Sequence, residues 1–140
     1  MEANAVKQSP RQTILLAEDF DDTRLMMKLW LTKKGYRVLE AESGEEAIAL
    51  AQSQRPALII MDVMMPGLNG LDATRRIRED QSLKKTPIVV VSAYGAAEYR
   101  AKAINAGCTE YVSTPFEPEM LGRLIEKLLR ENEPPIASSF

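Results

Sequence analysis

The segment ALIIM at residues 57–61 runs without a polar break into Asp62, and this stretch decides the fold class. A strand with one solvated face alternates polar and apolar residues, whereas this segment does not. Such continuous apolar runs are typical of strands buried on both faces of a parallel sheet. Four further short runs predict strands: TILLA at 13–17, RVLEA at 37–41, PIVVVS at 87–92 and EYVS at 110–113.

The segments between these runs carry helix signals. The first helix is expected to begin near Asp21 and to end before Gly35, with acidic residues in its first turn and lysines in its last. It carries the apolar residues Leu25, Met26, Leu29 and Trp30. Ser43, followed three residues later by Glu46, forms a capping-box pattern that predicts the start of the next helix.

The last helix has the clearest pattern, because its apolar residues recur at helical spacing. They are Leu121, Leu124, Ile125, Leu128 and Leu129. Gly107 is expected to follow the end of the fourth helix. Strands that alternate with helices five times predict an α/β domain with a parallel sheet and helices on both faces. In such sheets ligands bind beyond the carboxyl ends of the strands.

Composition limits the domain organisation and the classes of function. A chain of 140 residues fits one core, expected over residues 13–132, with polar tails at 1–12 and 133–140. A net charge of −2 argues against direct nucleic-acid binding, and the lack of histidine excludes Ser-His-Asp and zinc-histidine sites within the chain. With one cysteine and no apolar run of membrane-spanning length, a cytoplasmic location without membrane attachment is expected.

Acidic side chains follow two of the predicted strands. Glu18 and Asp19 come after the first strand and Asp62 after the third, and the fourth ends in Ser92. Glu18 and Asp19 taken alone could also be an exposed acidic loop or a helix cap. Beside Asp62, however, clustered carboxylates would require a compensating cation. Oxygen ligands alone suit Mg²⁺, and a carboxylate beside such an ion can attack phosphorus.

Four segments in this order, ILLAED, LIIMDVMMPGLNG, VVVSAYG and GCTEYVSTPF, resemble the receiver domain of bacterial response regulators of two-component signalling, the chemotaxis regulators among them. The resemblance runs from about residue 13 to 132. It implies a doubly wound, flavodoxin-like fold whose five parallel strands have the order 2-1-3-4-5.

The resemblance also implies a role for each site residue. Asp62 would be the phosphoacceptor. Asp19 would bind Mg²⁺ directly and Glu18 through water, with Asp62 and the backbone carbonyl of Met64 completing the protein ligands. Ser92 would donate a hydrogen bond to the phosphoryl group, and Tyr111 would be the aromatic switch that turns inward.

One position departs from the family pattern. Receiver domains usually have lysine before the proline of the loop after the fifth strand, and here Thr114 precedes Pro115. Threonine has neither the charge nor the reach of lysine. The switch is therefore weakened, or another cation replaces the lysine. By the same resemblance, Met64 and Tyr94 flank the site and are expected to slow loss of the phosphoryl group.

The resemblance implies a single-domain signalling protein without enzyme activity beyond slow self-dephosphorylation. A sensor histidine kinase or a histidine phosphotransfer protein would phosphorylate it. Its output would pass to a protein partner, or through self-association, on the face formed by the fourth helix, fifth strand and fifth helix. The alternative is a pseudo-receiver, an interaction module that works without phosphate, which Thr114 favours. A magnesium-dependent phosphatase is disfavoured because Met64 stands where a second acid would be expected.

Overall fold

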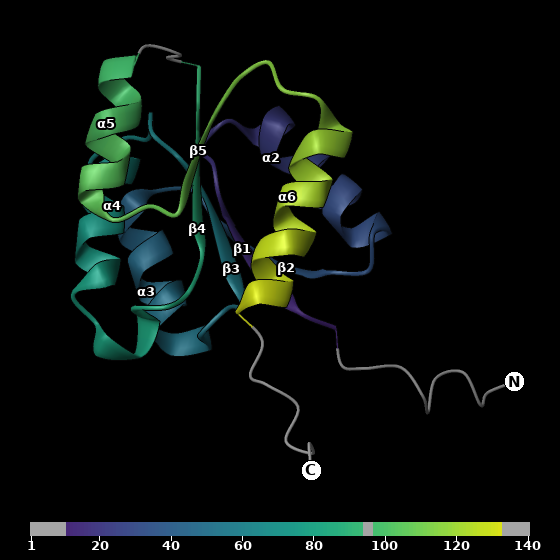
Figure 1. The fold of residues 1–140 in the computed structure, drawn as a ribbon, viewed down its shortest axis with the longest axis horizontal. Coiled ribbons are helices and arrows are strands. Elements are labelled where there is room, and N and C mark those ends of the chain that lie inside the picture. Colours follow the sequence, from purple (N-terminus) through teal and green to yellow (C-terminus); the bar gives the residue numbers. More distant parts are fainter. Residues whose placement is uncertain (1–10, 94–96, 133–140) are drawn as a thin grey trace, which may run out of the picture.

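A five-stranded parallel sheet forms the middle of the molecule (Figure 1). The computed structural model describes residues 11–93 and 97–132. The strands are β1 (Thr13–Ala17), β2 (Arg37–Ala41), β3 (Leu58–Asp62), β4 (Ile88–Ser92) and β5 (Glu110–Ser113). They pair in parallel in the order β2-β1-β3-β4-β5, which confirms the predicted fold class and strand order.

Helices cover both faces of the sheet. Figure 1 shows α2 (Asp21–Lys33) and α6 (Pro118–Glu131) on one side. The other side carries α3 (Gly44–Gln54), α4 (Gly70–Arg78) and α5 (Ala97–Ala106), and a short 3-10 helix, η1 (Gln81–Leu83), follows α4. No helix within 11–93 and 97–132 combines the length and the apolar character needed to cross a bilayer.

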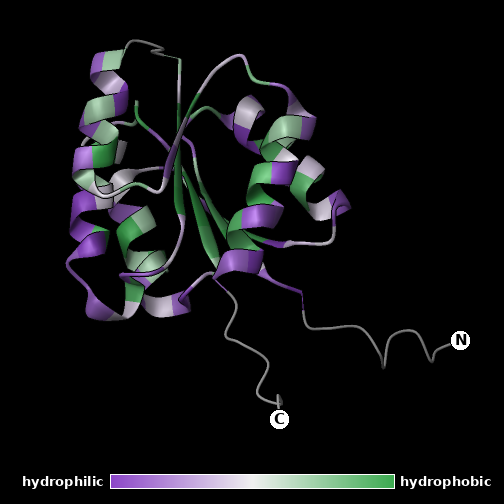
Figure 2. Cartoon of the chain, in the orientation of Figure 1, coloured by the Kyte–Doolittle hydropathy of each residue, from purple (hydrophilic) through white to green (hydrophobic). Residues whose placement is uncertain are grey.

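The central strands supply two cores because both their faces are covered. Ile14 and Leu16 of β1 pack in the core beneath α6, whereas Leu15 and Ala17 pack in the core on the opposite face. In Figure 2 the central strands of the sheet are coloured mostly as hydrophobic. This arrangement explains why the runs that predicted the strands contain so few polar residues.

The predicted helix boundaries hold, with one difference in the capping box. The Ser43 side chain accepts a hydrogen bond from the Glu46 N–H at 3.1 Å, as expected. The Glu46 carboxylate, however, accepts from the N–H of Glu42 at 2.7 Å, one residue before the cap. Gly107 follows α5 with a φ of 111°, a left-handed conformation that favours glycine. The predicted tails lie outside the described residues, apart from residues 11 and 12.

Two strands differ from their predicted limits: β3 is shifted by one residue at both ends, from 57–61 to 58–62, and β4 begins one residue later than predicted. β3 ends at Asp62 rather than at Met61, because Asp62 is still in register with Val91 of β4. β4 begins at Ile88 rather than at Pro87, which has no N–H to donate to a neighbouring strand. The acidic side chain at residue 62 thus belongs to the strand itself.

Candidate functional site

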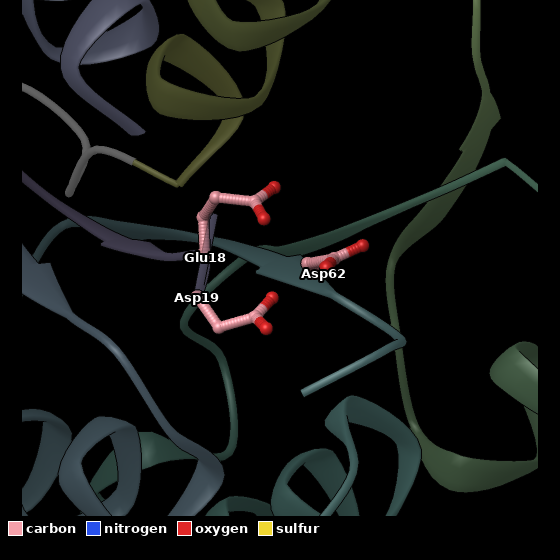
Figure 3. A group of neighbouring side chains, drawn as sticks. All are labelled: Glu18, Asp19 and Asp62. Carbon is pink, nitrogen blue, oxygen red and sulfur yellow. The ribbon is translucent and has the colours of Figure 1, made fainter. Parts of the chain in front are cut away.

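The carboxylates of Glu18, Asp19 and Asp62 converge at the carboxyl ends of the strands. β1 and β3 are neighbours with Ala17 in register with Met61, so the residues that follow Ala17 come to lie beside Asp62. One carboxylate oxygen from each of the three acids lies within 4.8 Å of the others. Figure 3 shows the three side chains projecting in the same direction from the ends of these strands. The predicted acidic cluster is therefore present.

Burial, together with the charge of neighbouring acids, raises the pKa values of Asp62 and Glu18. The pKa of Asp62 is raised from 3.8 to about 7, first by desolvation and then by the charges of Glu18 and Asp19. Burial also raises the pKa of Glu18, although the backbone N–H of Phe20 donates to its carboxylate at 3.0 Å. Negative charge that no neighbouring group neutralises is the environment in which a divalent cation binds. The donor set consists of oxygens alone, so it fits Mg²⁺.

The backbone around Asp62 is fixed by the loop that follows β3. The backbone N–H groups of Met64 and Val63 lie near the Asp62 carboxylate and partly offset the rise in its pKa, while the Val63 N–H donates to the carbonyl of Val91 at 3.4 Å. The N–H of Gly70 donates to the carbonyl of Val63 at 2.9 Å. A Cβ at Gly70 would overlap the carbonyl oxygen of Asp62. The start of α4 can therefore approach β3 this closely only because residue 70 is glycine. Met64 is 54 % exposed, and the ligand role of its carbonyl remains a prediction.

Ser92 and Thr114 lie next to each other across the ends of β4 and β5. Ser92, the last residue of β4, is 1 % exposed and in register with Ser113. Its carbonyl accepts hydrogen bonds from the Thr114 N–H at 2.8 Å and from the Thr114 hydroxyl at 3.5 Å. The peptide bond between Thr114 and Pro115 is cis.

No basic side chain replaces the family's lysine within the described residues. None of the lysines or arginines there forms an ion pair with Asp62. Lys84 and Lys85 precede β4, so they lie at the opposite edge of the sheet. Neutralising the negative charge around Asp62 would thus require a bound ion or a group from a partner.

Tyr111 is already buried in this structure. Its side chain is 5 % exposed and packs in the core on the α3, α4 and α5 side of the sheet. Its backbone carbonyl accepts a hydrogen bond from Arg100 at 3.4 Å. The switch role of Tyr111 remains a prediction, and Tyr94, the second residue expected to flank the site, lies outside the described residues.

Arg24 belongs to this region although the sequence did not single it out. It is 9 % exposed, and its guanidinium donates to the backbone carbonyl of Glu18 at 2.9 Å. It also pairs with the carboxylates of Asp21, Glu40 and Glu42. The only signal in the sequence is its position seven residues before the buried Leu31, on the inward stripe of α2.

Comparison with known proteins identifies relatives over most of the chain. A family model described as the response regulator receiver domain matches residues 14–126. The transcriptional regulatory protein AfsQ1 of Streptomyces coelicolor is 37% identical over 121 residues, which cover 86% of this chain and 52% of AfsQ1. The phosphate regulon regulatory protein PhoB of Pseudomonas aeruginosa is 32% identical over 123 residues, or 88% of this chain and 54% of PhoB. The chain thus spans about half the length of these curated relatives.

Solved structures of similar size share the fold. The chemotaxis protein CheY4 of Vibrio cholerae superimposes with a TM-score of 0.80 and 30% identity, covering 85% of this chain and 99% of that one. The receiver domain of the sensor histidine kinase PA1611 of Pseudomonas aeruginosa superimposes with a TM-score of 0.81 and 31% identity. The match covers 86% of this chain and 99% of that one. That second structure has a magnesium ion coordinated in its active site cleft.

Proposed function

The chain belongs to the family of response regulator receiver domains of two-component systems, and we propose that Asp62 is its phosphoacceptor. Receiver domains are signalling modules rather than classical enzymes. The observation that supports the proposal most is the group of three carboxylates within 4.8 Å, with Asp62 at the end of a buried strand. Such a cluster is a hard-cation site, and one of its members is placed to act as a nucleophile.

The residues of this chain have distinct roles in the proposed reaction. Asp19 and Asp62 would hold Mg²⁺ directly, Glu18 would hold it through water, and Met64 would contribute its backbone carbonyl. When bound, the ion neutralises the carboxylates and the charge that develops on phosphoryl oxygens. A carboxylate oxygen of Asp62 attacks the phosphorus of a phosphohistidine, an O–P bond forms, the P–N bond breaks and the imidazole leaves.

The donor is a sensor histidine kinase or a histidine phosphotransfer protein, and the compartment is the cytoplasm. The Ser92 hydroxyl donates to a phosphoryl oxygen, and its movement is transmitted to Tyr111. The output face consists of α5, β5 and α6, and it binds a downstream protein or a second copy of the chain. That the chain works as a single domain stays a prediction.

Intact-mass spectrometry after incubation with acetyl phosphate and Mg²⁺ tests the proposal. The wild-type chain is expected to gain the mass of one phosphoryl group, and Asp62→Asn is expected to gain none. Asp80→Asn is the matched control, since Asp80 lies just before η1 and away from the three acids, and it should react like the wild type. A wild-type chain that gains no mass, with Mg²⁺ present and the fold intact, contradicts the proposal.

Thr114 supports a second candidate function, a pseudo-receiver whose interactions do not depend on phosphate. Without the usual lysine the phosphorylated state lacks one charge-assisted hydrogen bond, worth on the order of 1.5 to 3 kcal/mol. A beryllofluoride mimic separates the two functions. Binding of the mimic at Asp62 supports the receiver, and the lack of both binding and mass gain supports the pseudo-receiver.

A further inference from the structure

Arg24 is the only buried member of the network of charged groups beside the three acids in the described part of the chain. All three guanidinium nitrogens are used: Nε donates to Glu40, one terminal nitrogen to the Glu18 carbonyl, and the other to Asp21 and Glu42. These donor–acceptor distances range from 2.7 Å for Asp21 to 3.4 Å for Glu42. Lys28 shares Glu40 with it at 2.9 Å.

The bond to Glu18 differs from the others because it reaches the backbone of the site. The Glu18 carbonyl belongs to the peptide group that joins Glu18 to Asp19, the expected direct ligand of Mg²⁺. The other peptide group of Glu18 is also held, since its N–H donates to the carbonyl of Ala41 at 2.9 Å. Beyond β1, the chain that carries two of the three carboxylates is therefore anchored on one side by β2 and on the other by Arg24.

We propose that Arg24 is a positioning residue for the cation site, which holds the Glu18–Asp19 peptide so that the Asp19 carboxylate stays beside Asp62. The inference rests on the proposed function, because it concerns the same site. Arg24 does not contact Asp62 and binds no substrate; it acts through the peptide that it fixes.

The physical reason is the repulsion among the three carboxylates. Without a cation, their charges favour separation, and a loop free to move would relax by turning Asp19 away. Mg²⁺ would then have to restore the geometry, at a cost to its affinity. Groups that orient metal ligands typically change metal affinity by 10- to 100-fold when they are removed. Only a guanidinium has the fork of donors that can bond Glu40 and the Glu18 carbonyl at once.

The chain contains a matched control for the stability that any buried arginine contributes. Arg78, at the end of α4, donates to the backbone carbonyls of Gly107, Leu83 and Thr86 at 2.7 to 2.8 Å. These contacts lie at the amino ends of the strands, away from the acids. Arg78→Met thus removes a comparable set of hydrogen bonds without touching the Glu18–Asp19 peptide.

The experiment measures the Kd of Mg²⁺ by isothermal titration calorimetry for the wild-type chain, Arg24→Met, Arg24→Lys and Arg78→Met. Urea unfolding in metal-free buffer gives the stability of each variant, and all titrations are made where circular dichroism shows the chain folded. We expect Arg24→Met to raise the Kd about tenfold or more. Arg24→Lys, which keeps the charge but loses the fork, is expected to fold and to raise the Kd by less. Arg78→Met should change the Kd less than twofold, whatever it costs in stability.

Three results overturn the inference. If Arg24→Met folds and its Kd for Mg²⁺ is unchanged, the inference is wrong. If Arg24→Met does not fold, an unchanged Kd in Arg24→Lys overturns the inference instead. An equal rise in Arg24→Met and Arg78→Met also overturns it, since a general loss of stability would then explain both. In each case the wild type still binds Mg²⁺ and the proposed function stands. A wild-type chain that binds no Mg²⁺ overturns the proposed function, and the inference with it.

Discussion

A buried or partly buried arginine binds one or more backbone carbonyls at each end of the sheet, but the groups around these two arginines differ in charge. At the amino ends of the strands, Arg78 donates to three backbone carbonyls, and burial lowers its pKa. At the carboxyl ends, Arg24 lies among carboxylates, and Asp21 foremost raises its pKa. The hydrogen-bond partners of Arg78 are neutral groups, so they leave no negative charge to be compensated. Even with Arg24 present, the acids at the other end retain excess negative charge, which is the charge that the proposed cation would neutralise.

Two aspartates repeat the contrast. Asp80 accepts hydrogen bonds from the N–H and the hydroxyl of Ser82 at 2.9 and 2.7 Å, which lower its pKa. Burial and two neighbouring acids raise the pKa of Asp62 to about 7. An aspartate thus caps a short helix at one end of the molecule. At the other end an aspartate is partly buried beside two like charges that disfavour its ionised form. Such an environment is typical of functional groups.

The largest effect on stability is expected at the amino ends. Arg78→Met should lower the free energy of unfolding by about 3 kcal/mol, because it leaves three backbone carbonyls without their charged donor. Urea unfolding followed by circular dichroism measures it. A loss below about 1 kcal/mol would mean that water replaces the guanidinium, and the contrast between the two ends would be weaker than the contacts indicate.

Mg²⁺ should stabilise the folded chain by acting only at the carboxyl ends. At pH 8 and a free concentration 100 times the Kd, the free energy of unfolding should rise by about 2.7 kcal/mol. Chelation with EDTA should reverse the gain, and Asp62→Asn should remove most of it. An equal gain in Asp62→Asn would place the ion somewhere else on the molecule.

Removing the charge of Asp62 should stabilise the metal-free chain. The pKa of Asp62 is about 7 in the folded chain and near 3.8 when unfolded, so the folded state retains a proton that the unfolded state has lost. The free energy of unfolding should therefore fall as the pH rises from about 4 through 7. Asp62→Asn should flatten this decline and raise the stability at pH 8 by about 1 to 2 kcal/mol, after allowance for solvent screening.

Urea unfolding of the wild type and Asp62→Asn at pH 5 and pH 8, both with EDTA, measures this effect. Glu40 provides the opposite case, since Lys28 and Arg24 lower its pKa, and its contribution is lost as the pH falls. A wild-type chain equally stable at pH 5 and pH 8 would show that the acids repel each other less than their positions indicate.

The smallest effect is expected from restoring the missing cation. Thr114→Lys should bring an ammonium toward Asp62 and lower its pKa by about 1 unit, as opposite charges at such distances do. Carbon-13 NMR titration of the metal-free chain measures the shift, with Thr109→Lys, at the amino end of β5, as a control. If the pKa of Asp62 stays near 7 in Thr114→Lys, the side chain at residue 114 does not reach the site.

The sequence by itself determined the fold class and the three acids of the candidate site. The runs at β1, β3 and β4 are apolar on both faces, and the stripe on α6 has helical spacing, so local patterns were sufficient for the parallel sheet and its helices. Positions directly after or at the end of a strand identified Glu18, Asp19 and Asp62, because all strands of a parallel sheet end at the same edge.

Tertiary structure alone decided what depends on residues far apart in the chain. Leu25, Met26 and Leu29 of α2 are more than half exposed while Arg24 is buried, which reverses what their hydropathy indicates. Arg24 is buried because Glu40 and Glu42, on and just after β2, come within its reach. The pKa of Asp62 likewise follows from its distance to Glu18 and Asp19 and from burial. The sequence pattern predicts neither the burial of Arg24 nor the raised pKa of Asp62, since both arise only when β1, β2 and β3 lie side by side.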